Sequence, residues 1–141
     1  MRHEVKKIAK IVNELTAFSL EYNAVNIDLR VRDLEDSIII TAIAKGITEI
    51  DEAVAHLREY LSYPRAKEME EYYWGLAGDT ESDEGLALIS VMIDDVTIDY
   101  DDEYVYIRVK RLKHDEKPKE KPPKKEKSKD KSKSILGKFK K

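Results

Sequence analysis

The sequence predicts an α+β fold, a two-layer α/β sandwich with helices on one face of an antiparallel four-stranded sheet. Two stretches, at 25–44 and 96–110, contain apolar residues at alternating positions around a short polar turn, as in hairpins with one buried face. Stretches with apolar residues at helical spacing lie before the first hairpin and between the two hairpins. The expected order is therefore helix, two strands, three helices, two strands (αββαααββ).

The first expected helix covers residues 4–22, where apolar residues recur at helical spacing from Val5 to Tyr22. This apolar face should be buried. The opposite side should be solvated and should hold most of the polar residues, namely Lys6, Lys7, Lys10, Asn13, Glu14 and Glu21. Asn23 is expected to end the helix, because asparagine tolerates the left-handed backbone that closes helices.

The first hairpin follows directly, with apolar and polar residues alternating from Val25 to Arg32 and a polar turn at 33–36. The second strand, Ser37–Ala44, is more continuously apolar and should lie nearer the middle of the sheet. The face of the sheet that carries no helices should be polar. The residues that predict this polar face are Asp28, Arg30, Thr97, Arg108 and Lys110.

Two helices are expected after Gly46: one from Thr48 or Glu49 to Pro64, and one over residues 65–76. The acidic stretch at 79–84 should connect them to a buried helix capped by Ser82 or Asp83. That helix leads into the second hairpin, whose turn is expected at 101–103. The unit from 82 to 111 is the part on which the rest of the fold should pack.

Charge and composition divide the chain into a domain at 1–112 and a tail at 113–141. Residues 1–111 hold 13 Lys/Arg and 24 Asp/Glu, a net charge of −11, whereas residues 112–141 carry a net charge of +8. The tail contains too few apolar residues to form a core and is expected to be disordered. The chain contains no cysteine, no signal peptide and no apolar run of membrane-spanning length, which predicts a cytoplasmic protein.

The element order, the NEL segment at 13–15, Gly46 and the EGLALI segment at 84–89 resemble the histidine-kinase-like (GHKL) ATPase fold. Within that fold, the passage from the last helix into the last hairpin is most similar to the anti-sigma-factor serine kinases. The resemblance covers residues 4–112. It implies a nucleotide site and, as partners, a sigma factor, an anti-sigma antagonist or a second copy of the chain.

The resemblance also identifies the positions that would bind nucleotide. Glu14 matches the family's general base, but Phe18 stands where the family has an asparagine that holds Mg²⁺, and a phenyl ring offers no oxygen ligand. Ala42 stands where an aspartate accepts a hydrogen bond from adenine, in a motif continued by Ala44 and Gly46.

At the phosphate end of the implied site, Asp83 replaces the first of two glycines and Gly85 keeps the second. Asp83 lies in the acidic stretch at 79–84, which would repel phosphates. We therefore expect no ATP-dependent activity, no cofactor and no metal. Read without the resemblance, Glu14 would be an ordinary solvated side chain and Gly46 an ordinary turn residue.

Two groups of residues are candidate contacts for a protein partner. One is the aromatic cluster Tyr72, Tyr73 and Trp74, which could equally pack against the core. The other is the C-terminal SILGKFKK stretch, where apolar residues return in a basic context as Ile135, Leu136 and Phe139. The first helix and the 63–84 segment are the expected binding surfaces.

The leading functional hypothesis is a non-catalytic, histidine-kinase-like domain that binds a protein partner in bacterial signalling. One alternative is a divergent ATP-binding serine kinase that still uses Glu14. Another is an adaptor tethered by its basic tail to anionic membrane or nucleic acid. The cationic tail could also dock on the acidic domain of its own chain.

Overall fold

The computed structural model describes the backbone of residues 2–73 and 82–113, and the side chains of residues 4–71 and 85–113. The predicted order of helices and strands is confirmed. The elements are α1 (Arg2–Glu21), β1 (Asn26–Asp33), β2 (Ser37–Lys45), α2 (Ile50–Tyr60), α3 (Lys67–Tyr73), α4 (Ser82–Ser90), β3 (Asp95–Tyr100) and β4 (Tyr104–Leu112).

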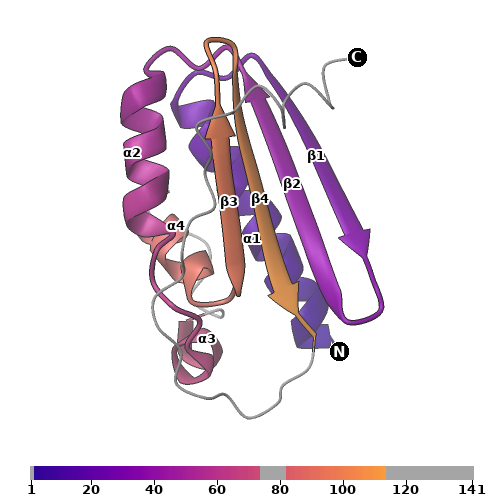
Figure 1. The fold of residues 1–141 in the computed structure, drawn as a ribbon. Coiled ribbons are helices and arrows are strands. Elements are labelled where there is room, and N and C mark those ends of the chain that lie inside the picture. The colour runs from indigo at the N-terminus through magenta and orange to yellow at the C-terminus, as the bar shows by residue number, and fades with distance from the viewer. Residues whose placement is uncertain (1, 74–81, 114–141) are drawn as a thin grey trace.

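The four strands form one antiparallel sheet in the order β1-β2-β4-β3, so β2 and β4 join the two hairpins at its centre. The central position expected for the second strand is therefore confirmed. The helices lie on one face of the sheet: α1 crosses behind the strands and α2 runs beside β3 (Figure 1). This arrangement is the predicted two-layer α+β sandwich.

The core lies between the helices and the inner face of the sheet. Residues that pair directly across antiparallel strands point to the same face, so Ala42 of β2 and its partner Ile107 of β4 both face the helices. The helices contribute the largest side chains to this layer, and α4 is covered on several sides, as expected. The fully buried large side chains of the core are Ile11, Leu15, Phe18, Ile40, Leu57, Leu61, Leu86, Ile89, Met92, Ile93, Ile98 and Ile107.

The strand β1 differs from the half-buried strand that its sequence predicts. Leu29 pairs with Ala42 and Val31 pairs with Ile40, so both side chains point toward the helix layer. Both are nevertheless exposed, Val31 at 48%. Since β1 is the edge strand, the helix layer does not extend far enough to cover it.

The apolar face of α1 is buried as predicted, at Ile11, Leu15 and Phe18, but the buried surface extends to polar residues beside it. Lys7, Lys10 and Glu14, which were expected on the solvated side, are buried, whereas Val5 is exposed. The prediction for these polar residues was wrong because the apolar spacing does not show which of them find a charged partner, whether in α3, as for Lys7, or within α1, as for Lys10 and Glu14. The buried surface of α1 therefore includes charged residues.

The ends of the helices agree better with their sequence signals. Asn23, just beyond α1, has a φ of 71°, the left-handed conformation expected of a residue that ends a helix. The helix α4 ends at Ser90, so Met92 and Ile93 are buried from the turn that follows the helix. No helix in the described part of the chain is both long and apolar enough to cross a membrane.

Two valine substitutions test whether the inner face of β1 is open. Val105→Ala removes a side chain that is 0% exposed in β4, and should lower the free energy of unfolding by about 2–3 kcal/mol. Val31→Ala removes an exposed side chain and should cost only about 0.5 kcal/mol. Urea unfolding of both variants measures this difference, and equal losses would mean that β1 is covered in solution.

Candidate functional site

The positions that the resemblance assigns to nucleotide binding are packed inside the domain or serve its backbone. Phe18, Ala42 and Ala44 belong to the hydrophobic core that the helices and the sheet share. Gly46 follows β2, and Gly85 lies in α4 against Glu14. The side chain of Asp83 lies outside the described residues, as do those of the other acidic residues at 79–84.

Phe18 has a structural neighbourhood that explains its side chain. Its ring is buried and lies 5.0 Å from the ring of Tyr22, whose hydroxyl is hydrogen-bonded to Nδ1 of His56 in α2. The ring of Tyr60 lies 5.7 Å from that of His56 and continues the contact along α2. Phe18 thus starts a row of rings that joins the end of α1 to α2.

Ala42 and Ala44 lie on the inner face of β2 and have no exposed surface. Their partners across the sheet are Ile107 and Val105 on β4, with Leu29 and Ile27 on β1. Methyl groups at these two positions give the helix layer a close approach to the strand. Neither residue can form a polar contact with a ligand through its side chain.

Glu14 is neither solvated nor open to a substrate. Its side chain is 6% exposed, and its carboxylate accepts a hydrogen bond of 2.5 Å from the buried Nζ of Lys10, one turn earlier in α1. The same carboxylate lies against Gly85: a Cβ at that position would stand 1.9 Å from Oε1 of Glu14. Gly85 is therefore needed for α4 to approach a charged side chain of its own protein.

Gly46 fills a backbone role at the end of β2. Its φ is 92°, a value that side chains disfavour, and a Cβ there would stand 2.6 Å from Cγ2 of Val25. Its N–H donates to the carbonyl of Glu103 in the turn between β3 and β4. The interpretation of Gly46 as a turn residue is consistent with these contacts.

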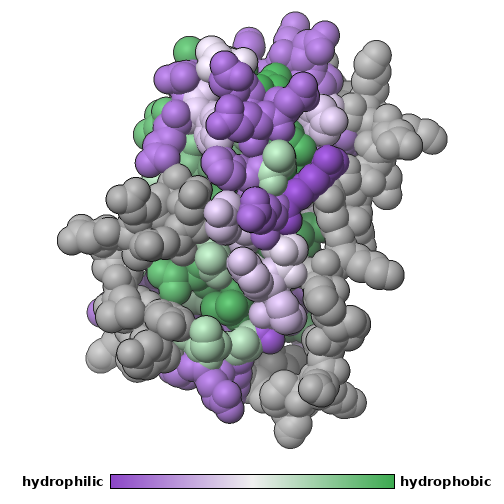
Figure 2. All heavy atoms as spheres, turned by 90° about the vertical axis from the view of Figure 1, so that its left-hand side faces the viewer, coloured by the Kyte–Doolittle hydropathy of each residue, from purple (hydrophilic) through white to green (hydrophobic). Residues whose placement is uncertain are grey.

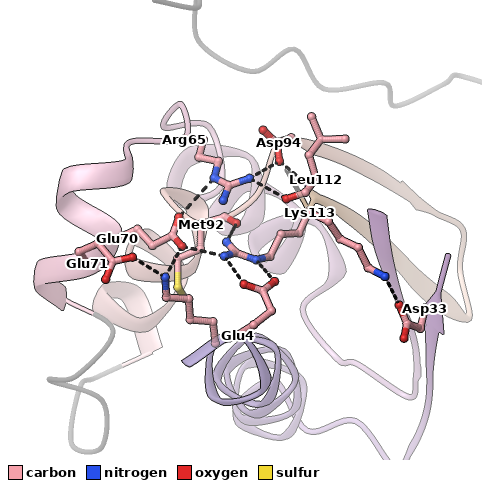
Figure 3. Close-up of polar contacts among 11 residues, drawn as sticks. Glu4, Asp33, Arg65, Glu70, Glu71, Met92, Asp94, Leu112 and Lys113 are labelled. Carbon is pink, nitrogen blue, oxygen red and sulfur yellow. Dashed lines mark hydrogen bonds and ion pairs between the residues drawn. The ribbon is translucent and has the colours of Figure 1, made fainter. Parts of the chain in front are cut away.

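A second group of polar residues, which sequence reasoning missed, lies at the opposite end of the helix layer (Figure 3). Arg111 of β4 donates from Nε and Nη2 to the carboxylate of Glu4, from Nη2 to Glu70 at 2.7 Å, and from Nη1 to the carbonyl of Met92. Glu70, only 2% exposed, also accepts a hydrogen bond from Nζ of Lys7 at 2.6 Å. This cluster joins α1, α3 and β4.

Arg65 extends the cluster toward the second hairpin. Its guanidinium donates to Glu70, to Asp94 at 2.8 Å and to the carbonyl of Leu112. Asp94 in turn accepts the backbone N–H of Leu112. These contacts give each buried charge a partner of opposite sign, as a structural ion cluster requires.

The cluster shifts the pKa values of its acids and bases in the direction that keeps them charged. Hydrogen bonds from Arg111 lower the pKa of Glu4 more than burial raises it. Burial raises the pKa of Glu70, but the hydrogen bonds from Arg111 and Lys7, together with the charges of Arg111 and Arg65, lower it to below its usual value. Burial lowers the pKa of Arg111, whereas Glu4 and Glu70 raise it to a value above its usual range.

The chain matches no known family model and no curated protein sequence. Within residues 2–73 and 82–113, no three His, Asp or Glu side chains lie close enough together to hold a metal ion. The remaining candidate residues fall outside the described side chains. These are Tyr72 and Tyr73 of α3, Trp74, and the tail residues Ile135, Leu136 and Phe139.

The ion pair between Lys10 and Glu14 can be tested by removing one charge or both. Glu14→Gln leaves the Lys10 charge buried without its partner and should lower the free energy of unfolding by about 3 kcal/mol. The double variant Lys10→Met, Glu14→Gln removes both charges and should recover most of that loss. Urea unfolding provides the measurement, and a neutral single variant would show that Lys10 reaches water.

The ion cluster predicts a loss of stability in acid. Because the pKa values of Glu4 and Glu70 are lower in the folded protein, the unfolded chain binds protons first as the pH falls. The stabilisation is present at neutral pH and should be lost below about pH 4. Denaturant unfolding between neutral pH and pH 3 measures this loss.

Arg111→Met should lower the free energy of unfolding at neutral pH by about 3–5 kcal/mol, because Glu70 loses a buried partner. The same variant should lose less stability on acidification, since its Glu70 is no longer held ionised by the guanidinium. Arg108→Met, at an exposed position of the same strand, is the matched control and should change stability by less than about 0.5 kcal/mol. An unchanged acid slope in Arg111→Met would contradict this account of the cluster.

Proposed function

We propose that residues 4–112 form a non-catalytic, histidine-kinase-like domain that acts as a protein-binding module in signalling, in the manner of the bacterial anti-sigma factors. The family part of this proposal rests on the resemblance of the αββαααββ order and of the EGLALI segment. The candidate partners that follow from it are a sigma factor, an anti-sigma antagonist or a second copy of the chain.

The observation that carries the non-catalytic part is the position of Glu14. A general base must reach the proton that it removes, in a site that admits substrate. The Glu14 carboxylate is instead buried, paired with Lys10 and seated against Gly85. Its charge is already paired with Lys10 within α1, and its carboxylate packs against α4, which supports a structural role for this residue.

The residues at the adenine and Mg²⁺ positions support the same conclusion. Phe18 and Ala42 are packed together with the core, and their side chains carry no oxygen or nitrogen atom for a ligand. A nucleotide in the family's pose would have to displace Phe18 from its contact with Tyr22. Removing a packed aromatic side chain from a core costs about 3–5 kcal/mol, which would oppose binding.

The surfaces proposed for the partner carry exposed apolar residues. Val5 and Leu20 are exposed on α1, and Leu29 and Val31 are exposed on the uncovered inner face of β1. In the 63–71 segment, Tyr63 and Met69 are exposed. The side of the molecule formed by α2, α3 and α4 is hydrophilic in its upper half and shows hydrophobic side chains in its lower half (Figure 2).

Calorimetric titration of the full chain with Mg·ATP tests the loss of nucleotide chemistry. We expect a Kd for Mg·ATP of about 1 mM or higher, which corresponds to a binding free energy no more favourable than about −4 kcal/mol. Micromolar binding that requires Mg²⁺ would reject the proposal and support the divergent kinase.

Photo-crosslinking tests the protein-binding part directly. A crosslinking amino acid placed at Val31 or Tyr63 should trap one discrete partner when the full chain is expressed in its native cell, whereas the same group at Glu52 should not. Glu52 is the matched control because it is exposed in α2, away from both proposed surfaces. Equal adducts at all three sites would contradict a defined surface.

A further inference from the structure

The strand β1 lies at one edge of the sheet, and the part of the chain that the structure describes places no further strand beside it. The other edge strand, β3, is shorter and has α2 beside it (Figure 1). There the guanidinium of Arg58 lies 5.8 Å from the centroid of the Tyr100 ring. In β1, every residue except Ile27 is exposed. The open edge of the sheet is therefore the edge formed by β1.

The backbone of β1 presents hydrogen-bonding groups at this edge. In an antiparallel pair, alternate residues of a strand direct both their N–H and their C=O toward the neighbouring strand. Leu34 donates to the carbonyl of Ser37 at 2.9 Å in the turn of the first hairpin, so the residues of β1 that bond to β2 are the even-numbered ones. The N–H and C=O groups of Ile27, Leu29 and Val31 therefore point away from β2, toward the open edge.

The strand β1 lacks the features that usually prevent an edge from pairing with another strand. Such features are a proline, a bulge or a charged side chain on the inner face. From Asn26 to Arg32 the register with β2 is continuous, and the inner-face residues are Ile27, Leu29 and Val31. The side chains of Leu29 and Val31 stay exposed in the single chain. This edge is therefore suited to pairing with a further strand.

We propose that β1 pairs with β1 of a second copy of the chain, antiparallel and centred on Leu29. The two four-stranded sheets then form one continuous sheet around a two-fold axis, with both helix layers on the same face. In this register Leu29 forms a hydrogen-bonded pair with Leu29 of the second copy, and Ile27 forms one with Val31. The exposed apolar side chains of the inner face cover each other across the axis.

The charges on the outer face of β1 favour this register over its neighbours. Asp28 and Arg30 lie on that face, as predicted, and centring the pair on Leu29 sets each Asp28 opposite Arg30 of the other copy. Arg32 falls opposite the uncharged Asn26. Centring the pair on Asp28, Arg30 or Val31 would instead set like charges of the two copies opposite each other. The strand is thus self-complementary in one register.

This inference rests on the proposed function in one respect, because it assigns the β1 part of the partner surface to a second copy of the chain. The pairing itself follows from the strand and does not depend on the resemblance. The two can fail separately. A monomeric chain would leave the crosslinking at Val31 to report a different partner, whereas micromolar binding of Mg·ATP would reject the non-catalytic proposal and leave the dimer in place.

Sedimentation equilibrium and amide hydrogen exchange of the full chain, both measured over a range of protein concentrations, test the pairing. We expect the mass to rise toward that of two chains, and the amides of Ile27, Leu29 and Val31 to become protected over the same range. The even-numbered amides of β1 already bond to β2 and should not change. A chain that stays monomeric up to about 1 mM, or a dimer in which those three amides stay unprotected, would overturn the proposal.

Charge reversal tests the register. Asp28→Arg and Arg30→Asp each turn two attractive pairs into repulsive ones, because the two-fold axis repeats every pair, and each should weaken dimerisation by about tenfold or more. The double variant Asp28→Arg, Arg30→Asp restores opposite charges and should recover most of the affinity. Both side chains are exposed, so circular dichroism should show all three variants folded. Single variants that dimerise as well as the natural chain, or a double variant as weak as the single ones, would contradict the register.

The chain contains no cysteine, so a single substitution can also trap the pair. Leu29→Cys sets two thiols directly opposite each other, with Cα atoms about 5.5 Å apart, which is within the range of a disulfide. The matched control Arg32→Cys, on the same strand, places its two copies about 20 Å apart. Mild oxidation should link Leu29→Cys into a covalent dimer and leave Arg32→Cys largely unlinked. Equal linking of both variants would overturn the proposed pairing.

Discussion

The hydrogen-bonded ion pair between Arg111 and Glu70 is the contact on which the arrangement of the helix layer depends. Among the described side chains of α3, Glu70 is the buried one, while Lys67, Glu68, Met69 and Glu71 are exposed. Within residues 67–71, the part of α3 whose side chains are described, the buried contact is therefore a charged one. A salt bridge of this kind needs good geometry to offset the cost of desolvation, so it fixes the orientation of α3 more narrowly than apolar packing would. Tyr63 and Met69, which belong to the proposed partner surface, both lie shortly before Glu70 in the sequence.

The local features of the fold could be predicted from the sequence because they depend on neighbours along the chain. Alternation predicted both hairpins, the continuous apolar run of β2 predicted its central place, and Asn23 predicted the end of α1. Burial of the polar residues could not be predicted in this way. Lys7 meets Glu70 across 63 positions of sequence, and Arg111 meets Glu4 across 107. No periodicity within α1 distinguishes these charges from solvated ones.

The candidate site was identified through the resemblance and not through the residue pattern, and it stays a prediction. Phe18, Ala42 and Ala44 are part of the hydrophobic core, as are residues of α2, α4, β3 and β4. The resemblance gave no indication that Glu14 is paired with Lys10, although their spacing of four in a helix is the signal that could have suggested it. Gly85 was expected to approach a phosphate, but the negative group beside it is the Glu14 carboxylate.

At Gly85, a side chain of the protein itself stands where the resemblance would place the phosphates of a nucleotide. On the inner face, Glu14 provides a negative charge at the first turns of α4, where the helix dipole favours an anion. The apolar residues proposed to bind a partner lie away from this position, at Val5 and Leu20 of α1, Leu29 and Val31 of β1, and Tyr63. Asp33 is the last residue of β1, so its ion pair with Lys113 places the start of the tail at the end of the strand that carries Leu29 and Val31.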